Sequence, residues 1–125
     1  MSYDFHLIAE NNPLDTDFAR ACAMFEDKFT VAPAGKSEHF ILVLAGEQLA
    51  LITAPRLVPP EELNRVFGTD VARQLRGAAW VSEVSCPMDK DTAEAVRSFL
   101  MITVHETRGV VIDPQSRETM NVLDS

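Results

Sequence analysis

Hydrophobic side chains recur at every second position in two stretches of the chain. Residues 3–9 and 78–86 both alternate in this way, so each is predicted to form a β-strand. Pro87 is expected to end the second strand, because proline has no N–H group to give to a sheet. A short apolar run at 110–113 predicts a further strand, and 117–122 predict one last edge strand.

Two other stretches repeat their hydrophobic residues at helical spacing. Residues 15–29 place apolar side chains three or four positions apart and predict a first helix, with Asp15 as its amino-terminal cap. Residues 92–105 predict the last helix, capped by Asp89 or by Asp91. Both helices are expected to bury an apolar stripe and to turn their charged side chains to water.

A third helical stretch begins after two consecutive prolines and continues to Leu75. Its first turn contains Glu61 and Glu62, whose negative charges suit the positive end of a helix dipole. Gly68 interrupts the stretch and is a position at which it can break into two short helices.

Between the helix predicted at 15–29 and the helical stretch that begins after the two prolines, the pattern indicates a loop and then a β-hairpin. Residues 32–37 contain Pro, Gly, Lys and Ser and are expected to form the loop. The apolar runs 40–44 and 49–52 flank Gly46, and a glycine at the first central position predicts a type II′ turn. These strands are apolar on both faces, which is typical of strands covered on both sides. One face is expected to lie under helices, and the other needs a third helix, a second subunit or a partner.

In chain order these elements predict an α+β fold, β-α-β-β-α-β followed by α-β and a final β. The expected architecture is a single-layer, mainly antiparallel sheet with three helices. Its first six elements follow the ferredoxin-like split βαβ order. The sequence contains no repeat, low-complexity tract or Gly/Ser linker, so one globular domain is expected over 1–125.

Charge and composition narrow the functional classes. The chain has 125 residues, and its 19 acidic against 11 basic residues give a net charge of -8. A chain of this charge lacks the basic footprint of an unassisted nucleic-acid binder. No apolar run approaches the roughly 20 residues of a membrane span, and the first residues do not resemble a signal peptide. A cytoplasmic location without membrane attachment is therefore expected.

The cysteines and histidines do not form a recognisable metal-binding pattern. Cys22 and Cys86 are far apart in the sequence and are expected to be reduced and buried. His6, His39 and His105 lack the spacing of a zinc motif. No metal and no cofactor are expected.

Acidic residues are the main candidates for contact with a partner. Most of them lie at predicted helix starts, where capping and the helix dipole already explain an acidic side chain. Glu83 instead lies inside a predicted strand, and Asp113 lies at the end of one, a place where functional residues often gather. The candidate partner-binding residues are Glu61, Glu62, Glu83, Asp89, Asp91, Glu94 and Asp113.

An enzymatic function has little support in the sequence. Nucleophile elbows, phosphate-binding loops and dinucleotide-binding glycine motifs are all absent. An active site built from His6, Glu83 and Asp113 would depend entirely on the fold bringing these residues together. We therefore expect no catalytic residues.

The part of the chain from Trp80 to Gln115 resembles small bacterial domains found beside contact-dependent and secreted toxins. In those domains a strand with Trp and Glu leads through a proline to a helix, and then to a glycine-valine-aspartate-proline-glutamine turn. The matching residues here are Trp80, Glu83, Pro87, Gly109, Val110, Asp113, Pro114 and Gln115, with the helix at 92–105. Such domains act as immunity proteins, and the resemblance implies no catalytic residue.

Two functions from different classes follow. The first is a non-enzymatic bacterial protein that binds another protein, in its most specific form an immunity protein that neutralises a basic toxin domain through its acidic surface. The alternative is a homodimeric small-molecule sensor or regulatory domain of ferredoxin-like type. In that case the hairpin, whose strands are apolar on both faces, would pair with or pack against its counterpart in the second subunit.

Overall fold

The computed structural model describes residues 2–35, 38–75, 77–105, 109–113 and 118–120. In chain order its elements are β1 (Ser2–Ala9), α1 (Asp17–Met24), β2 (Phe29–Pro33), β3 (Phe40–Leu44), β4 (Glu47–Ile52), β5 (Arg56–Val58), α2 (Pro60–Phe67), α3 (Thr69–Arg73), β6 (Ala79–Pro87), α4 (Lys90–Thr103), β7 (Gly109–Asp113) and β8 (Glu118–Met120). The predicted α+β class and antiparallel sheet are confirmed, although the described part contains four helices rather than three.

The strands form one sheet in the order β2-β3-β4-β6-β1-β7-β8, with β5 paired to β6 beside the end of β4. Every pairing is antiparallel. The ferredoxin-like order is not observed. A split βαβ arrangement would place β4 next to β1, whereas here β6 lies between them, and β2 and β5 are additional strands.

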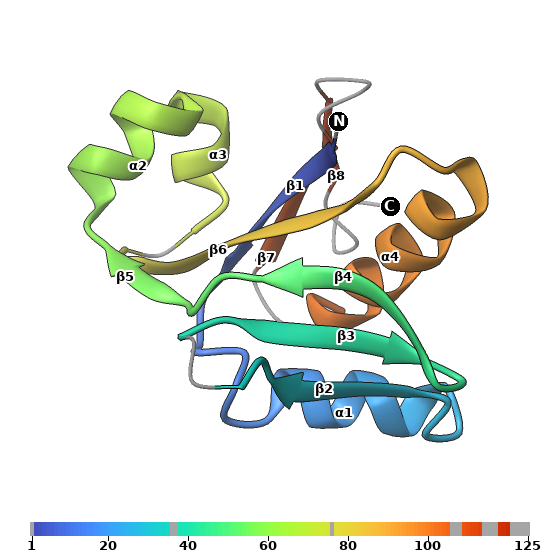
Figure 1. The fold of residues 1–125 in the computed structure, drawn as a ribbon. Helices are drawn as coiled ribbons and strands as arrows, with labels where there is room; N and C mark the ends of the chain where they lie inside the picture. The colour runs from blue at the N-terminus through green and yellow to red at the C-terminus, as the bar shows by residue number, and fades with distance from the viewer. Residues whose placement is uncertain (1, 36–37, 76, 106–108, 114–117, 121–125) are drawn as a thin grey trace.

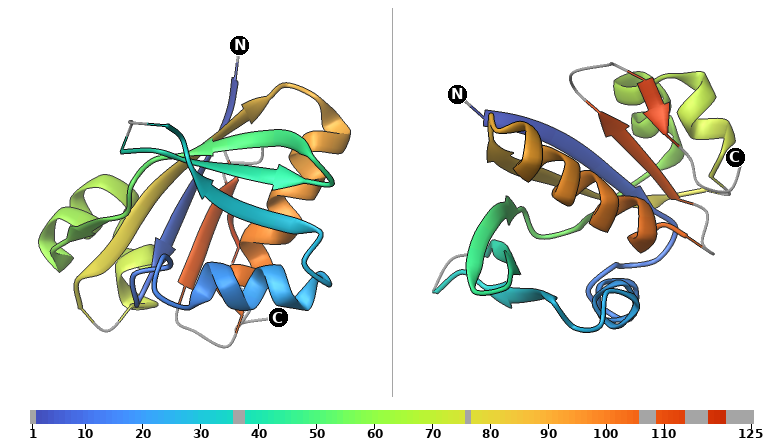
Figure 2. Two further views of the ribbon diagram at one scale, coloured as in Figure 1. Left: turned by 60° about the horizontal axis from the view of Figure 1, so that its bottom comes forward. Right: turned by 90° about the vertical axis from the view of Figure 1, so that its right-hand side faces the viewer.

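The sheet bends around α4 (Figures 1 and 2). Strands β2, β3 and β4 lie on one side of this helix, and strands β1 and β7 lie on another. We call the face toward α1 and α4 the inner face. The main core lies there and joins Leu42 of β3, Phe99 of α4 and Val111 of β7. On the outer face, α2 and α3 cover a second, smaller core that includes Ile8, Leu63 and Val110. Strand β1 thus carries apolar residues for both cores, Phe5 and Leu7 inward and Ile8 outward.

Helix α1 is shorter than the sequence pattern predicts. It begins after Thr16 rather than with an Asp15 cap, and the side chain of Thr16 makes no capping hydrogen bond. Glu26 and Asp27 then adopt positive φ angles of 58° and 61°, a left-handed conformation that stops the helix. Phe29 still enters the main core, but from β2 rather than from α1. Part of the stretch predicted as a loop, 32–33, therefore belongs to a strand.

The predicted hairpin is confirmed, and its turn is of a different type. Leu44 lies opposite Glu47, so Ala45 and Gly46 are the two central residues, with φ of 51° and 85°. Positive φ at both positions is the pattern of a type I′ turn rather than type II′. Gly46 is the second central residue and not the first.

The other helix boundaries follow the predicted signals closely. Gly68 has a φ of 97° and separates α2 from α3. Asp89, not Asp91, caps α4, because its Oδ2 accepts a hydrogen bond from the Thr92 backbone N–H at 3.0 Å. The strands predicted at 3–9, 78–86 and 110–113 appear as β1, β6 and β7. Strand β8 falls within the predicted 117–122, and Pro114 and Gln115 lie outside the described residues.

A charged pair fastens α1 to the carboxyl end of α4. Asp17 is only 1% exposed and forms an ion pair with Arg20 at 3.1 Å. Arg20 Nη2 also donates hydrogen bonds to the backbone carbonyls of Thr103 at 2.8 Å and His105 at 3.1 Å. The guanidinium therefore satisfies carbonyl groups that the end of a helix leaves without partners.

Candidate functional site

The outer face of the β2–β4 strands is not covered by any helix that the structure describes. Cross-strand pairs connect Ala32, Ile41, Leu51, Ser85 and Asp4 in one row across β2, β3, β4, β6 and β1. Because directly opposed residues of a sheet lie on the same face, this row marks a continuous surface. We call this surface, with Val43 beside it, the open face.

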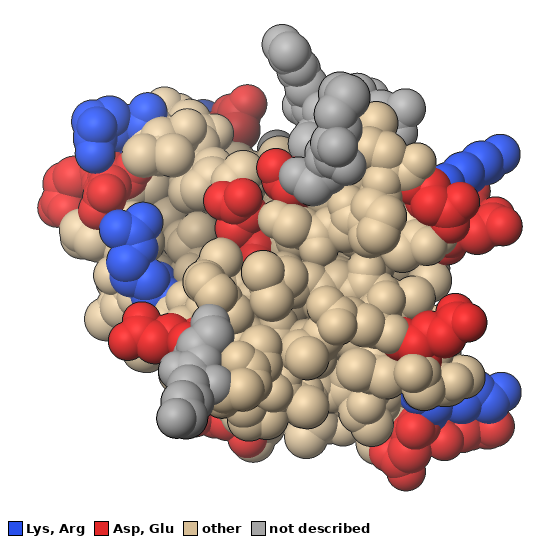
Figure 3. All heavy atoms as spheres, in the orientation of Figure 1, with Lys and Arg blue, Asp and Glu red and all other residues tan. Residues whose placement is uncertain are grey.

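The open face is apolar at its centre. Leu51 is 38% exposed, and Ile41 and Val43 are half-buried. Figure 3 shows a broad area over β3 and β4 without charged side chains, with several acidic and a few basic groups around its border. An apolar centre within a charged rim is the arrangement found in protein–protein interfaces.

One side of the open face leads into a gap between two strands. Strands β4 and β6 pair only at Leu51 with Ser85 and at Ile52 with Val84. Beyond Leu51 they separate and leave a cavity of about 380 Å³, lined by residues 48–51 of β4 and 85–87 of β6. We call this cavity the fork.

A bulge in β4 and a proline in β6 accompany the separation of the two strands. The register between β3 and β4 shifts at Leu42 and Val43, which gives β4 an extra residue at Leu49. Such a bulge bends the strand that carries it. Pro87, at the far end of the fork, has no N–H group with which to continue a ladder.

The surroundings of the fork are acidic although its lining is uncharged. The pKa of the Cys86 thiol is raised, first by burial and then by the carboxylates of Asp4 and Asp89. Glu47 is exposed at the start of β4. A positively charged group near the fork would therefore be attracted to it.

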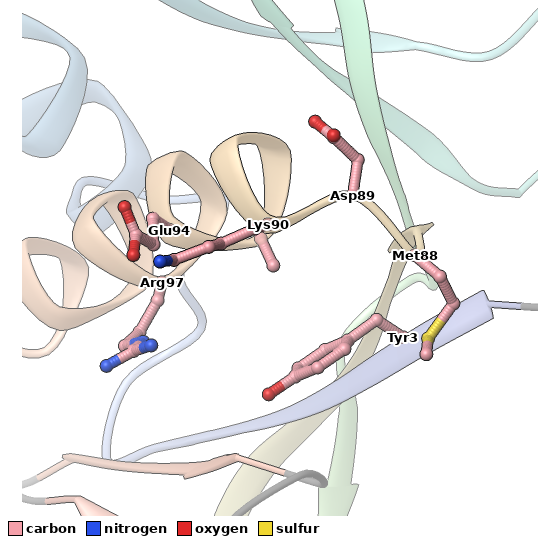
Figure 4. Close-up of a pocket in the computed structure, with 7 residues that line it drawn as sticks. Tyr3, Met88, Asp89, Lys90, Glu94 and Arg97 are labelled. Carbon is pink, nitrogen blue, oxygen red and sulfur yellow. The ribbon is translucent and has the colours of Figure 1, made fainter.

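A second cavity, of about 370 Å³, lies at the start of α4 and is lined by Tyr3, Met88, Asp89, Lys90, Ala93, Glu94 and Arg97. Figure 4 shows the Tyr3 ring along β1, with the Lys90, Glu94 and Arg97 side chains projecting from the helix opposite. The Tyr3 hydroxyl donates a hydrogen bond to the buried carboxylate of Asp113. Arg97 Nε lies 3.7 Å from the same carboxylate. The lining of this cavity carries both signs of charge, so the cavity does not select an anion or a cation by charge alone.

The structure separates the acidic residues singled out by the sequence into three groups. Asp89 and Glu94 line the same cavity at the start of α4, and Asp91 is exposed in the same helical turn. Glu83 is exposed on the outer face of β6. Glu61 and Glu62 lie at the start of α2, on the other side of the sheet from α4.

Besides Asp89, which caps α4 through Thr92, two of these residues have local structural partners. Glu62 lies 3.6 Å from Arg65 of the same helix, and Asp113 is 4% exposed and hydrogen-bonded to Tyr3. The Asp113 carboxylate is too buried to touch a docked protein. The hydrogen bond with Tyr3 connects β7 to β1. Asp113 is therefore no longer a candidate for contact with a partner.

The three residues of the enzymatic hypothesis do not come together. His6 and Glu83 lie opposite each other on the outer face of β1 and β6. Asp113 carries its side chain on the inner face, where it meets Tyr3. The sheet itself separates the carboxylate from the imidazole, so the proposed constellation does not form.

Sequence reasoning missed the fork and the Tyr3–Asp113 contact, both of which depend on strand pairing. It also missed the buried Asp17, whose pKa is raised by burial and lowered in part by Arg20. A helical spacing of Asp and Arg three residues apart was the available signal for that pair.

Within the described residues, the His, Cys, Asp and Glu side chains form no cluster of three that could hold a metal ion. Cys22 and Cys86 are both free thiols. None of the described helices is long and apolar enough to cross a membrane. Comparisons with protein-family models, with curated proteins and with solved structures find no match to this chain.

Proposed function

We propose that this protein is a non-enzymatic binding domain that recognises a basic protein through its open face. In its most specific form it is an immunity protein that neutralises a cognate bacterial toxin. The observation that carries the proposal is the uncovered apolar area around Leu51, with a charged border in which acidic groups outnumber basic ones, on a chain of net charge -8.

Each part of this surface has a role in the proposed binding. The apolar centre supplies the free energy of burial, and the acidic rim attracts and orients a basic partner. An acidic surface also resembles the polyanionic substrates of many basic enzymes, so it can block an active site by mimicry. The exposed acids Glu83, Asp89, Asp91 and Glu94 are the contacts that we expect around this face, with Glu61 and Glu62 farther away.

The test compares capture of proteins by the wild type, by Leu51→Lys and by Met24→Lys. Leu51 lies in the open face, and Met24 is 54% exposed on α1, so both changes add one positive charge to an exposed apolar position. We expect the wild type and Met24→Lys to bind one basic protein stoichiometrically. Leu51→Lys should lose that protein, because the new ammonium group would be buried beside positive charge.

The captured protein must then lose its own activity or toxicity when the wild type is added. Equal capture by all three proteins would contradict a role for the open face. Binding by the wild type that leaves the partner's activity or toxicity unchanged would retain the binding function and reject the immunity role.

The uncovered sheet face also bears on the alternative, a homodimeric sensor. Two copies joined through this face would each bring a charge of -8, which opposes association at low salt. Light scattering of the purified protein decides between the two. A stable dimer that Leu51→Lys converts to a monomer would favour the sensor and count against the binding of a basic partner through this face.

A further inference from the structure

The fork leaves backbone groups of two strands without a neighbouring strand. In the part of the chain that the structure describes, β4 pairs with β3 on one side along its length, but meets β6 only at Leu51 and Ile52. Likewise β6 pairs with β1 up to Pro87, whereas its other edge has no strand partner beyond Ser85. Strand edges of this kind are templates for the addition of another strand.

The position of the fork distinguishes it from the outer edges of the sheet. At the β2 edge, helix α1 lies alongside the strand, and Val31 of β2 and Cys22 of α1 line the same cavity. Extending the register of Leu51 and Ser85 by one residue would place Ala50 opposite Cys86, and this pair is not formed. The fork therefore presents an edge inside the sheet, next to the open face.

The chemistry of the fork selects the kind of segment that fits. Its lining contains apolar and small polar side chains and no charged group. Near it lie Asp4, which is paired with Ser85 of the lining, Asp89, two residues after Pro87, and the exposed Glu47. An extended segment with alternating apolar and basic residues would place one set of side chains in the cavity and the other toward the carboxylates.

We propose that the fork binds an extended segment of the basic partner, which adds to the free edge of β4 as an additional strand. This inference rests on the proposed function and specifies its binding mode. Main-chain hydrogen bonds to β4 supply affinity with little dependence on sequence, and the surrounding acids supply the preference for lysine and arginine.

A short peptide of alternating lysine and valine, blocked at both ends, is the probe. Titrated into the isotope-labelled protein, it should bind saturably, with a dissociation constant below about 1 mM. Backbone amide signals of residues 47–51 and 85–86 should shift more than those of α1 and α2. The same peptide methylated on alternate backbone nitrogens keeps its charge but loses hydrogen-bond donors, and it should bind at least about tenfold more weakly.

Two protein variants locate the site. Gln48 lines the fork, so Gln48→Lys should weaken peptide binding by about fivefold through repulsion. Ala23, exposed on α1, provides the matched control, and Ala23→Lys should bind as the wild type does. Circular dichroism and the unchanged amide spectrum away from residue 48 would show that both variants are folded.

Several results would overturn this inference. One is absence of peptide binding up to about 1 mM, and another is equal binding of the methylated and unmethylated peptides. A third is a change of backbone amide signals confined to the acidic first turns of α2 or α4. An equal effect of Gln48→Lys and Ala23→Lys would do the same. Leu51 belongs to both the open face and the fork, so Gln48→Lys distinguishes them: capture of a basic protein that Leu51→Lys abolishes but Gln48→Lys leaves unchanged would reject the fork and retain the open face.

Discussion

Leu51 of β4 lies directly opposite Ser85 of β6, and beyond this pair the two strands no longer meet. The pair therefore marks the boundary between a closed sheet and a fork. It also sits in the row of residues that forms the open face. Leu51 thus belongs to both proposed binding features, so a substitution there should affect both, and the comparison with Gln48→Lys in the fork separates them.

The Tyr3–Asp113 hydrogen bond should stabilise the fold, because it joins β1 to β7 in a buried setting. Tyr3→Phe removes the donor and is expected to lower the free energy of unfolding by about 1–3 kcal/mol. Urea denaturation of the wild type, Tyr3→Phe, Asp113→Asn and the double variant measures the coupling. Simple additivity of the two single losses would mean that the residues do not interact.

Stability should depend on pH through Asp17. Burial raises its pKa above the ordinary 3.8, although Arg20 lowers it in part. The folded state therefore holds this proton more tightly than the unfolded state does. The Asp17 contribution to stability should fall as pH rises from about 3.8 through the folded-state pKa.

Asp17→Asn removes that titration and keeps a side chain of similar size. The free energy of unfolding of both proteins is measured by urea denaturation across this pH range. That of the wild type should fall relative to that of Asp17→Asn as pH increases. A difference that changes in the opposite direction would show that the ion pair with Arg20 outweighs burial.

Gly109 is required because of close packing at the start of β7. A Cβ added there would lie 2.5 Å from Val104 Cγ1, a distance that demands movement. Gly109→Ala is therefore expected to cost about 1–3 kcal/mol of stability. Val104→Gly removes both Cγ1 and the Val104 Cβ, which would lie 2.6 Å from the added atom, so the double variant should lose less stability than the sum of the two single variants. An additive double variant would contradict the steric explanation.

The hairpin turn offers a stabilising substitution. Ala45 has a φ of 51°, a conformation that asparagine tolerates better than alanine. Ala45→Asn should raise the free energy of unfolding by about 0.5–1 kcal/mol. Ala78→Asn is a suitable control because Ala78 is exposed and does not adopt positive φ. A similar gain in both variants would show that the effect is not conformational.

Much of the secondary structure was predictable because the relevant signals are local. Asp89 and Thr92 lie three residues apart and form the cap of α4, and Gly68 separates two helices by its own backbone conformation. Alternation in β1 and β6 predicted the strands. It also placed Trp80, Ser82, Val84 and Cys86 on one side of β6, as the inner-face packing of Val84 and Cys86 confirms.

The topology was not predictable from the same signals. Phe29 continues the helical spacing of α1 and yet belongs to β2, because the core accepts its ring from either element. Strand β5 has only three residues and pairs with β6 next to the end of β4, which no local pattern specifies. The same holds for the candidate site. The acidic residues could be identified in the sequence, but the open face and the fork are formed only by strand pairing.

Hydrogen exchange of the protein, alone and bound to its captured basic partner, tests the central claim most directly. Binding through the open face should slow exchange in peptides covering β3 and β4, 40–52, and the end of β6, while peptides from α1 and α2 keep their free-state rates. Protection confined to α2 or to the start of α4, with β3 and β4 unchanged, would contradict binding through the open face.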